Sequence, residues 1–288
     1  MIFQLNSKQI EQAFQMQNYC IEYSKCSDAE DQLCAIYFSS NEIYYPNTSA
    51  AFQYSILEND KYEWKKNRLL KASKHIFIRD IHKQWYLSGI NSILDNPFKL
   101  LDFLKIETQG YVINTIGSSA GGYAALLFGS LLNAHKVFAF NAQFNLFAIM
   151  KLSNVNKDPI LFEKVNDQTY FKYFDLSNIL NNNSLYFYFH SANSQLDIDQ
   201  LNSITPQAKS LLNIIRFNTA NHGFPFLRVN LPAIFSFDQT TLIGLANKKL
   251  HPMLFSFKLI GVIPTLKFII VAFKDRFLKK KLEFIHKK

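Results

Sequence analysis

A serine between two glycines is the feature of this sequence that most directly indicates chemistry. Residues 117–121 read Gly-Ser-Ser-Ala-Gly, which matches the pattern G-x-S-x-G. In this pattern the central serine sits on a sharp turn from a strand into a helix, where larger flanking side chains would clash. The register makes Ser119, and not Ser118, the expected nucleophile. The amide of Ala120, at the positive end of the following helix, is expected to donate to a developing oxyanion.

A serine hydroxyl is a weak nucleophile unless a base accepts its proton and a third group orients that base. His222 lies in the segment RFNTANHGFPF, just after a predicted late strand, and Gly223 and Pro225 give this segment loop character. His190 ends another predicted strand, where a histidine is also typical of a core or a rim. We therefore expect His222 to be the base.

The acid that orients the histidine should lie between the serine and the histidine in the chain, after the preceding strand. The segment SLYFYFHSANSQLDIDQ offers Asp197 and Asp199 at that place. We favour Asp197 because of its distance from the end of the strand. Asp199 stays open as an alternative, since it could instead be the favourable acid at the start of the next helix.

The loop after the run KHIFIRD is expected to complete the site. The amide of Ile81 or His82 is predicted to be the second oxyanion donor, while Asp80 is expected to fix the loop. Trp85 and Tyr86 are predicted to line the substrate pocket, although aromatic residues after a strand also commonly close a core.

These residues need a scaffold of alternating strands and helices. Strands are predicted at 33–40, 74–80, 111–116, 136–143, 184–191 and 210–219. Helices are predicted at about 7–23, 96–108 and 123–132. The alternation favours an α/β fold with a doubly wound, mostly parallel sheet. The stretch at about 146–183 is too long for an ordinary connection and is predicted to form a cap over the site.

Composition favours a single catalytic domain over residues 1–250, followed by a basic amphipathic extension over 251–288. Of the 288 residues, 48% are hydrophobic and 18% are charged, which is typical of a packed globular core. Cys20, Cys26 and Cys34 form no CxxC pair, so we expect reduced thiols, a cytoplasmic protein and no bound metal. The first residues also lack the apolar core of a secretory signal.

The net charge of +9 predicts polyanionic partners, but no zinc spacing or other nucleic-acid motif is present, so we expect no nucleic acid. Residues 254–273 are strongly apolar yet contain Lys258, Pro264 and Lys267. This pattern favours a helix lying on an anionic membrane surface, here the inner membrane, over one that spans it. The alternative is packing on the domain itself or on a second subunit of a homo-oligomer.

The motifs GSSAGGYAALLFG, RDIHKQWYLSG, LDIDQ and NTANHGF together resemble the α/β-hydrolase superfamily. More narrowly, they are similar to serine-dependent enzymes of bacterial capsule loci, including capsule O-acetyltransferases that use acetyl-CoA. The resemblance covers roughly residues 33–226. It implies an α/β-hydrolase fold with a cap insertion, Ser119, Asp197 and His222 as the triad, and a polysaccharide as the acyl acceptor.

Two other functions remain open at this stage. A carboxylesterase or glycan deacetylase would use the same three residues, with water in place of the acceptor hydroxyl. A scaffold subunit of a polysaccharide assembly complex would need no catalysis. The net positive charge favours transfer, because a positively charged protein attracts both a phosphorylated donor such as acetyl-CoA and an anionic polysaccharide.

Overall fold

The structure is a computed structural model that describes residues 3–24, 32–246, 248–271 and 274. Its centre is an eight-stranded sheet in the order β1-β3-β2-β4-β5-β6-β7-β8. The strands are β1 (Tyr19–Tyr23), β2 (Leu33–Phe38), β3 (Lys74–Ile78), β4 (Val112–Ser118), β5 (Lys136–Phe140), β6 (Leu185–Ser191), β7 (Leu212–Phe217) and β8 (Lys249–Leu250). Only β1 is antiparallel to its neighbour, so the predicted doubly wound, mostly parallel sheet is confirmed.

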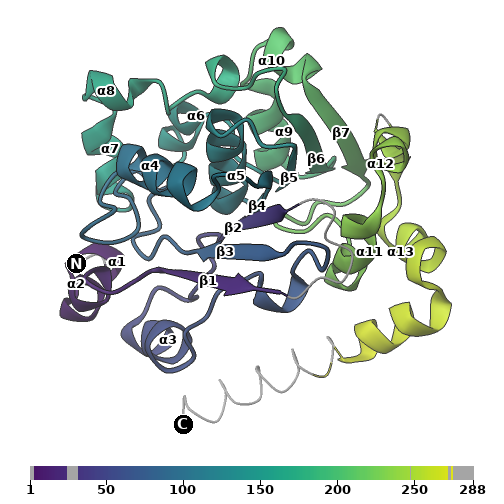
Figure 1. Ribbon diagram of the computed structural model, residues 1–288, viewed down its shortest axis with the longest axis horizontal. Helices are drawn as coiled ribbons and strands as arrows, with labels where there is room; N and C mark the ends of the chain where they lie inside the picture. The colour runs from purple at the N-terminus through teal and green to yellow at the C-terminus, as the bar shows by residue number, and fades with distance from the viewer. Residues whose placement is uncertain (1–2, 25–31, 247, 272–273, 275–288) are drawn as a thin grey trace.

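Both faces of the sheet are buried, because alternate residues of each strand enter two different apolar clusters. In β2, Ile36 and Phe38 belong to the cluster on one face, and Tyr37 belongs to the cluster on the other. Helices cover each cluster (Figure 1). The first face carries α4 (Pro97–Glu107), α5 (Ala120–Leu131), α6 (Leu146–Met150), α7 (Pro159–Lys164), α8 (Gln168–Phe171), α9 (Gln195–Asn202) and α10 (Pro206–Ser210). The second face carries α11 (Leu231–Ser236), α12 (Gln239–Leu245) and α13 (Pro252–Ile260).

A third, smaller cluster lies beyond the carboxyl ends of β2 and β3. It includes Ile10, Tyr44, Phe52 and Ile81. The helices that contribute to it are α1 (Phe3–Asn6), α2 (Lys8–Phe14) and α3 (Ser49–Phe52).

The N-terminal segment differs from the helix predicted at 7–23. The helix begins near Ser7 as predicted, with Ser7 as its cap, but it ends at Phe14 and Tyr19–Tyr23 forms the edge strand β1. The buried side chain of Asn18 explains the change, because its Nδ2 donates to the carbonyls of Ala13 and Ile90, each at 2.9 Å. These bonds end the helix and direct the chain along β3.

The insertion at 146–183 consists of α6, α7, α8 and a 3-10 turn, Leu176–Asn178, and it lies beside α4 and α5 (Figure 1). Tyr123 in α5 donates its hydroxyl to the carbonyl of Tyr173 at 2.7 Å, which fixes the insertion to the core. Its role as a cap over the site stays a prediction.

The C-terminal segment begins directly after the sheet, since β8 ends at Leu250 and α13 begins at Pro252. Gly261 then takes a φ of 88°, and residues 262–271 are helical again. The part of the chain that the structure describes contains no helix that is both long enough and apolar enough to cross a bilayer.

Candidate active site

The turn between β4 and α5 has the strained geometry that the glycine-flanked serine predicts. Ser119 has φ 53° and ψ −120°, outside the helical and extended regions. A Cβ on Gly121 would lie 2.3 Å from the carbonyl oxygen of Phe38, and a Cβ on Gly117 would lie 2.0 Å from that of Gly121. Both positions therefore require glycine, and the turn presents Ser119 at the carboxyl edge of the sheet.

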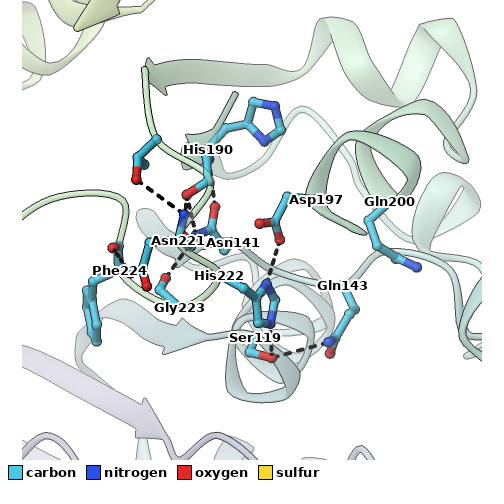
Figure 2. Close-up of polar contacts among 12 residues, drawn as sticks. Ser119, Asn141, Gln143, His190, Asp197, Gln200, Asn221, His222, Gly223 and Phe224 are labelled. Atoms are coloured by element: carbon cyan, nitrogen blue, oxygen red, sulfur yellow. Dashed lines mark hydrogen bonds and ion pairs between the residues drawn. The ribbon is translucent and has the colours of Figure 1, made fainter. Parts of the chain in front are cut away.

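Three side chains from distant parts of the chain meet at this edge (Figure 2). Ser119 Oγ lies 2.9 Å from His222 Nε2. His222 Nδ1 lies 2.8 Å from Asp197 Oδ1, and the Asp197 side chain is almost fully buried. Since a carboxylate only accepts, Nδ1 carries the proton and Nε2 is free to take the serine proton. The arrangement can deprotonate Ser119 as it attacks a carbonyl carbon.

The geometry distinguishes between the two candidate acids. Asp197 lies in the first turn of α9, and its carboxylate points at His222 (Figure 2). Asp199, two residues later, lies about 200° further around the helix and so faces another side. Asp199 is exposed and accepts a hydrogen bond of 2.7 Å from Gln195 Nε2. The structure therefore brings Asp197, and not Asp199, to the histidine. His190 is a buried histidine 3.4 Å from the Tyr188 hydroxyl, and burial lowers its pKa to about 4.

The loop that carries His222 is held by one buried side chain that the sequence analysis did not single out. Asn141 Nδ2 lies 3.2 Å from the carbonyl of Asn221 and 3.1 Å from that of Gly223, on either side of the histidine. The same amide group bonds Ser191 at the end of β6, through Oγ at 2.8 Å and through its amide at 2.8 Å. Asn141 thus joins the ends of three neighbouring strands beneath the site.

Gln143 is a second residue that the sequence analysis missed. Its Nε2 lies 3.2 Å from Ser119 Oγ, and its Oε1 accepts a hydrogen bond of 2.8 Å from Trp85 Nε1. An indole nitrogen only donates, so it must face the amide oxygen, which leaves the NH2 group for the serine. The signal in the sequence was its place just after the β5 run, next to the strand that carries the serine.

The loop after β3 is organised by Asp80, as expected. Its carboxylate accepts hydrogen bonds from the amides of His82 and Lys83 at 3.0 Å, Gln84 at 2.8 Å and Tyr86 at 2.9 Å. Burial raises the pKa of Asp80 to about 6, while these four amides act in the opposite direction. The result is a fixed loop in a backbone conformation with several positive φ values.

Two expectations for this loop need correction or restriction. The His82 amide is already engaged by Asp80, which corrects its assignment as an oxyanion donor, whereas Ile81 packs in the third cluster and its role stays a prediction. His82 follows β3, whereas Ser119 follows β4. The sheet order places β2, and not β3, next to β4, so the loop after β3 lies one strand further from the serine. Ala120 begins α5, where the amides of the first turn have no partner within the helix, and its role also stays a prediction.

Trp85 and Tyr86 are both buried and do not line the pocket beside His222. Tyr86 donates its hydroxyl to the carbonyl of Ser39 at 2.8 Å and is part of the core. Trp85 instead reaches the site indirectly, through Gln143. The prediction that Trp85 and Tyr86 line the pocket is therefore wrong. Tyr86 is a core residue, and Trp85 orients Gln143 beside the serine.

A pocket of about 720 Å³ opens beside His222. Part of its lining comes from the histidine loop and the residues after it, including Phe224 and Arg228, and part from Met253 and Phe268 in the C-terminal segment. The guanidinium of Arg228 lies 4.5 Å from the centre of the Phe224 ring. No lining residue comes from the insertion at 146–183.

Potential metal ligands are scattered in the described ranges, 3–24, 32–246, 248–271 and 274. Within them, no three His, Cys, Asp or Glu side chains gather to hold an ion. Cys20 and Cys34 are free thiols, and Cys26 lies outside the described residues.

Comparison with known proteins gives a match in structure but none in sequence. No model of a protein family matches the sequence, and no curated protein matches it either. The capsule O-acetyltransferase of Neisseria meningitidis serogroup A is similar in structure, with a TM-score of 0.52, 15% identity, and coverage of 80% of this chain and 92% of that one.

An S-formylglutathione hydrolase from Staphylococcus aureus is also similar, with a TM-score of 0.48, 12% identity, and coverage of 78% of this chain and 97% of that one. At 15% identity, the likeness to the capsule O-acetyltransferase concerns the fold. The strand order, the helices on both faces of the sheet and the serine turn after β4 agree with an α/β-hydrolase fold. The chain therefore has an α/β-hydrolase fold.

Proposed function

We propose that this protein is a serine-dependent O-acetyltransferase that moves an acetyl group from acetyl-CoA to hydroxyl groups of a bacterial capsular polysaccharide. The observation that carries the proposal is the continuous hydrogen-bonded path from Ser119 Oγ through His222 to the buried Asp197. Such a path activates a serine for acyl transfer.

In the first half-reaction, Ser119 Oγ attacks the thioester carbonyl carbon while His222 accepts the hydroxyl proton. Asp197 stabilises the imidazolium that forms, and the amide of Ala120 donates to the oxyanion. The thiolate of CoA leaves with the proton from His222, and an acetyl-serine remains. In the second half, His222 deprotonates a sugar hydroxyl, which attacks the acetyl carbon, and the returned proton restores Ser119.

Several observations support transfer from a CoA thioester. The capsule O-acetyltransferase of Neisseria meningitidis shares the fold over 92% of its chain. The pocket beside His222 combines apolar residues with the cation of Arg228 and the carboxylate of Glu42. Its apolar part suits a pantetheine arm, and Arg228 can meet the phosphates at the end of that arm. The free thiols of Cys20 and Cys34 agree with a cytoplasmic protein, which would have acetyl-CoA at hand.

A carboxylesterase or glycan deacetylase is the second candidate, and one observation favours it. Ser119 is partly accessible and the His222 side chain is 33% exposed, so water can reach an acyl-serine. A transferase must keep this water unproductive until the acceptor binds.

The experiment that separates the two candidates measures the fate of the acetyl group. Purified protein is incubated with acetyl-CoA carrying a labelled acetyl group and with capsular glycans, neutral and anionic, and Ser119→Ala serves as the control. We expect label on an anionic glycan and CoA release that rises with acceptor concentration. Rapid acetate release that is indifferent to every glycan would identify an esterase instead. A folded protein whose Ser119 fails to react with a fluorophosphonate would point to a scaffold.

A further inference from the structure

Positive charge is concentrated at one end of this chain. Residues 1–246 contain 20 lysines and arginines and 20 aspartates and glutamates, so they are balanced. Residues 247–288 contain 11 basic residues and only two acidic ones, Asp275 and Glu283. The whole net charge of +9 is therefore carried by the last 42 residues.

The helix at 262–271 presents an apolar stripe to solvent. Its large side chains Val262, Ile263, Leu266 and Ile270 are each between 46 and 69% exposed. At about 100° per residue, these four positions fall within about 100° of one another around the helix. A continuous apolar stripe of this kind on a protein surface marks an interaction site more often than chance exposure does.

The opposite face fixes the helix on the domain. Thr265 is fully buried, and its Oγ1 lies 3.3 Å from Ser256 Oγ, which in turn donates to Asn230 Oδ1 at 3.0 Å. Phe268 also lies on this side, where it lines the pocket beside His222. The helix runs along the periphery of the molecule beyond α13 (Figure 1). Its buried contacts therefore hold the apolar stripe outward.

Cations border the stripe. Lys267 is exposed and falls beside Ile263 and Ile270 around the helix, and Lys258 in α13 and Lys274 are exposed as well. An apolar helix face with lysines along its margin matches the boundary of a bilayer, where side chains insert between acyl chains and ammonium groups meet headgroup phosphates. Each basic residue near an anionic surface adds to this attraction.

We propose that the helix at 262–271 binds the surface of an anionic phospholipid bilayer, with Val262, Ile263, Leu266 and Ile270 inserted below the headgroups. A second copy of the chain is a poorer occupant, because it would bring two segments of net charge +9 together. Binding by this face orients the pocket, since the inner side of the same helix forms one of its walls. The proposal is independent of the acetyl transfer, because membrane binding is measured without turnover.

The experiment uses full-length protein and co-sedimentation with vesicles of phosphatidylcholine alone or of phosphatidylcholine with phosphatidylglycerol. The variant Ile263→Ser with Ile270→Ser removes two stripe side chains. The matched control, Ile93→Ser with Ile106→Ser, removes two isoleucines of equal or greater exposure elsewhere on the surface. Thermal unfolding verifies that each protein is folded.

We expect binding to the anionic vesicles that weakens as salt is added, a loss of on the order of tenfold or more for the stripe variant, and no loss for the control. Equal binding to both kinds of vesicle would overturn the electrostatic part of the proposal. Equal binding by the stripe variant and the control would overturn the assignment to this helix. A dimer that the stripe variant abolishes, without vesicle binding by the wild type, would show a second copy to be the occupant.

Discussion

The indole nitrogen of Trp85 donates a hydrogen bond of 2.8 Å to Gln143 Oε1, and this contact turns the Gln143 amide nitrogen toward Ser119. Trp85 itself belongs to the loop that Asp80 organises through four backbone amides. A chain of fixed contacts therefore runs from a buried carboxylate to the nucleophile. A donor held beside the serine oxygen in advance can stabilise charge that develops there.

Removing this donor should slow acylation. We expect Gln143→Ala to lower kcat for p-nitrophenyl acetate by about 10- to 100-fold with a small change in KM, because the contact strengthens as charge develops. Trp85→Phe should lower kcat less, since the amide is kept but is free to rotate. Gln143→Glu should be more harmful than Gln143→Ala, because it places a negative charge beside the attacking serine oxygen. A wild-type kcat for Gln143→Ala would show that the residue has only a structural part.

The two aspartates of α9 should respond very differently to loss of charge. In Asp197→Asn the buried acceptor for His222 Nδ1 is lost and the wrong tautomer is favoured, so we expect kcat to fall by about 10⁴-fold. Asp199→Asn changes only an exposed contact with Gln195 and should stay within about twofold of wild type. Rates of ester hydrolysis by the two variants check this. Comparable losses in both would argue against the assignment of Asp197.

Acid should destabilise the fold partly through His190. Burial lowers the pKa of His190 to about 4, against the attraction of Asp197 and with the help of Arg216. An unfolded histidine titrates near 6.5, so between these values the unfolded chain binds more protons. Stability contributed by the neutral ring is therefore complete above pH 6.5 and is lost as the pH falls toward 4.

The measurement is the free energy of urea unfolding of wild type and His190→Gln across this pH range. The wild type should lose up to about 1.4 kcal/mol per pH unit more than the variant, because one additional proton is taken up on unfolding. Parallel pH profiles for the two proteins would mean that His190 does not titrate in this way.

Two glycines with opposite surroundings should give opposite results when changed to alanine. Gly121→Ala places a Cβ 2.3 Å from the backbone of Phe38, so the turn or β2 must shift. Gly244, in α12, has open space at its Cβ position. Urea unfolding should show a loss of more than about 2 kcal/mol for Gly121→Ala and a gain of about 0.5 to 1 kcal/mol for Gly244→Ala. A neutral Gly121→Ala would indicate that the serine turn tolerates more space than the structure shows.

Local patterns were sufficient to predict six of the eight strands, β2 to β7, and the three residues that meet at the edge of the sheet. The turn around Ser119 and the loop around His222 each follow a strongly apolar, extended run, so their places were readable without knowledge of their neighbours. The alternation of strands and helices then required the ends of parallel strands to lie at one edge.

Features that depend on the order of strands in space were not predictable in this way. Asn141 and Gln143 follow β5, but their contacts with the histidine loop and with Ser119 arise only because β5 lies between β4 and β6. The sheet order also explains why His82, after β3, was misassigned. The helix predicted through Tyr23 failed because Asn18, an ordinary polar residue in sequence, is buried and ends it.

Asn141 fixes the loop that carries the catalytic base and does so independently of the C-terminal part of the pocket. Its buried amide ties the histidine backbone to the end of β6, so the base is held from the interior of the sheet. The pocket residues Met253 and Phe268 come from the C-terminal segment, whereas the side-chain hydrogen bonds of Asn141 go to Ser191, Asn221 and Gly223. On the proposed function, contacts with the acyl donor and proton transfer thus reside in separate parts of the chain, and other acyl donors can be sought by redesigning the surroundings of Met253 and Phe268 while the triad is left unchanged.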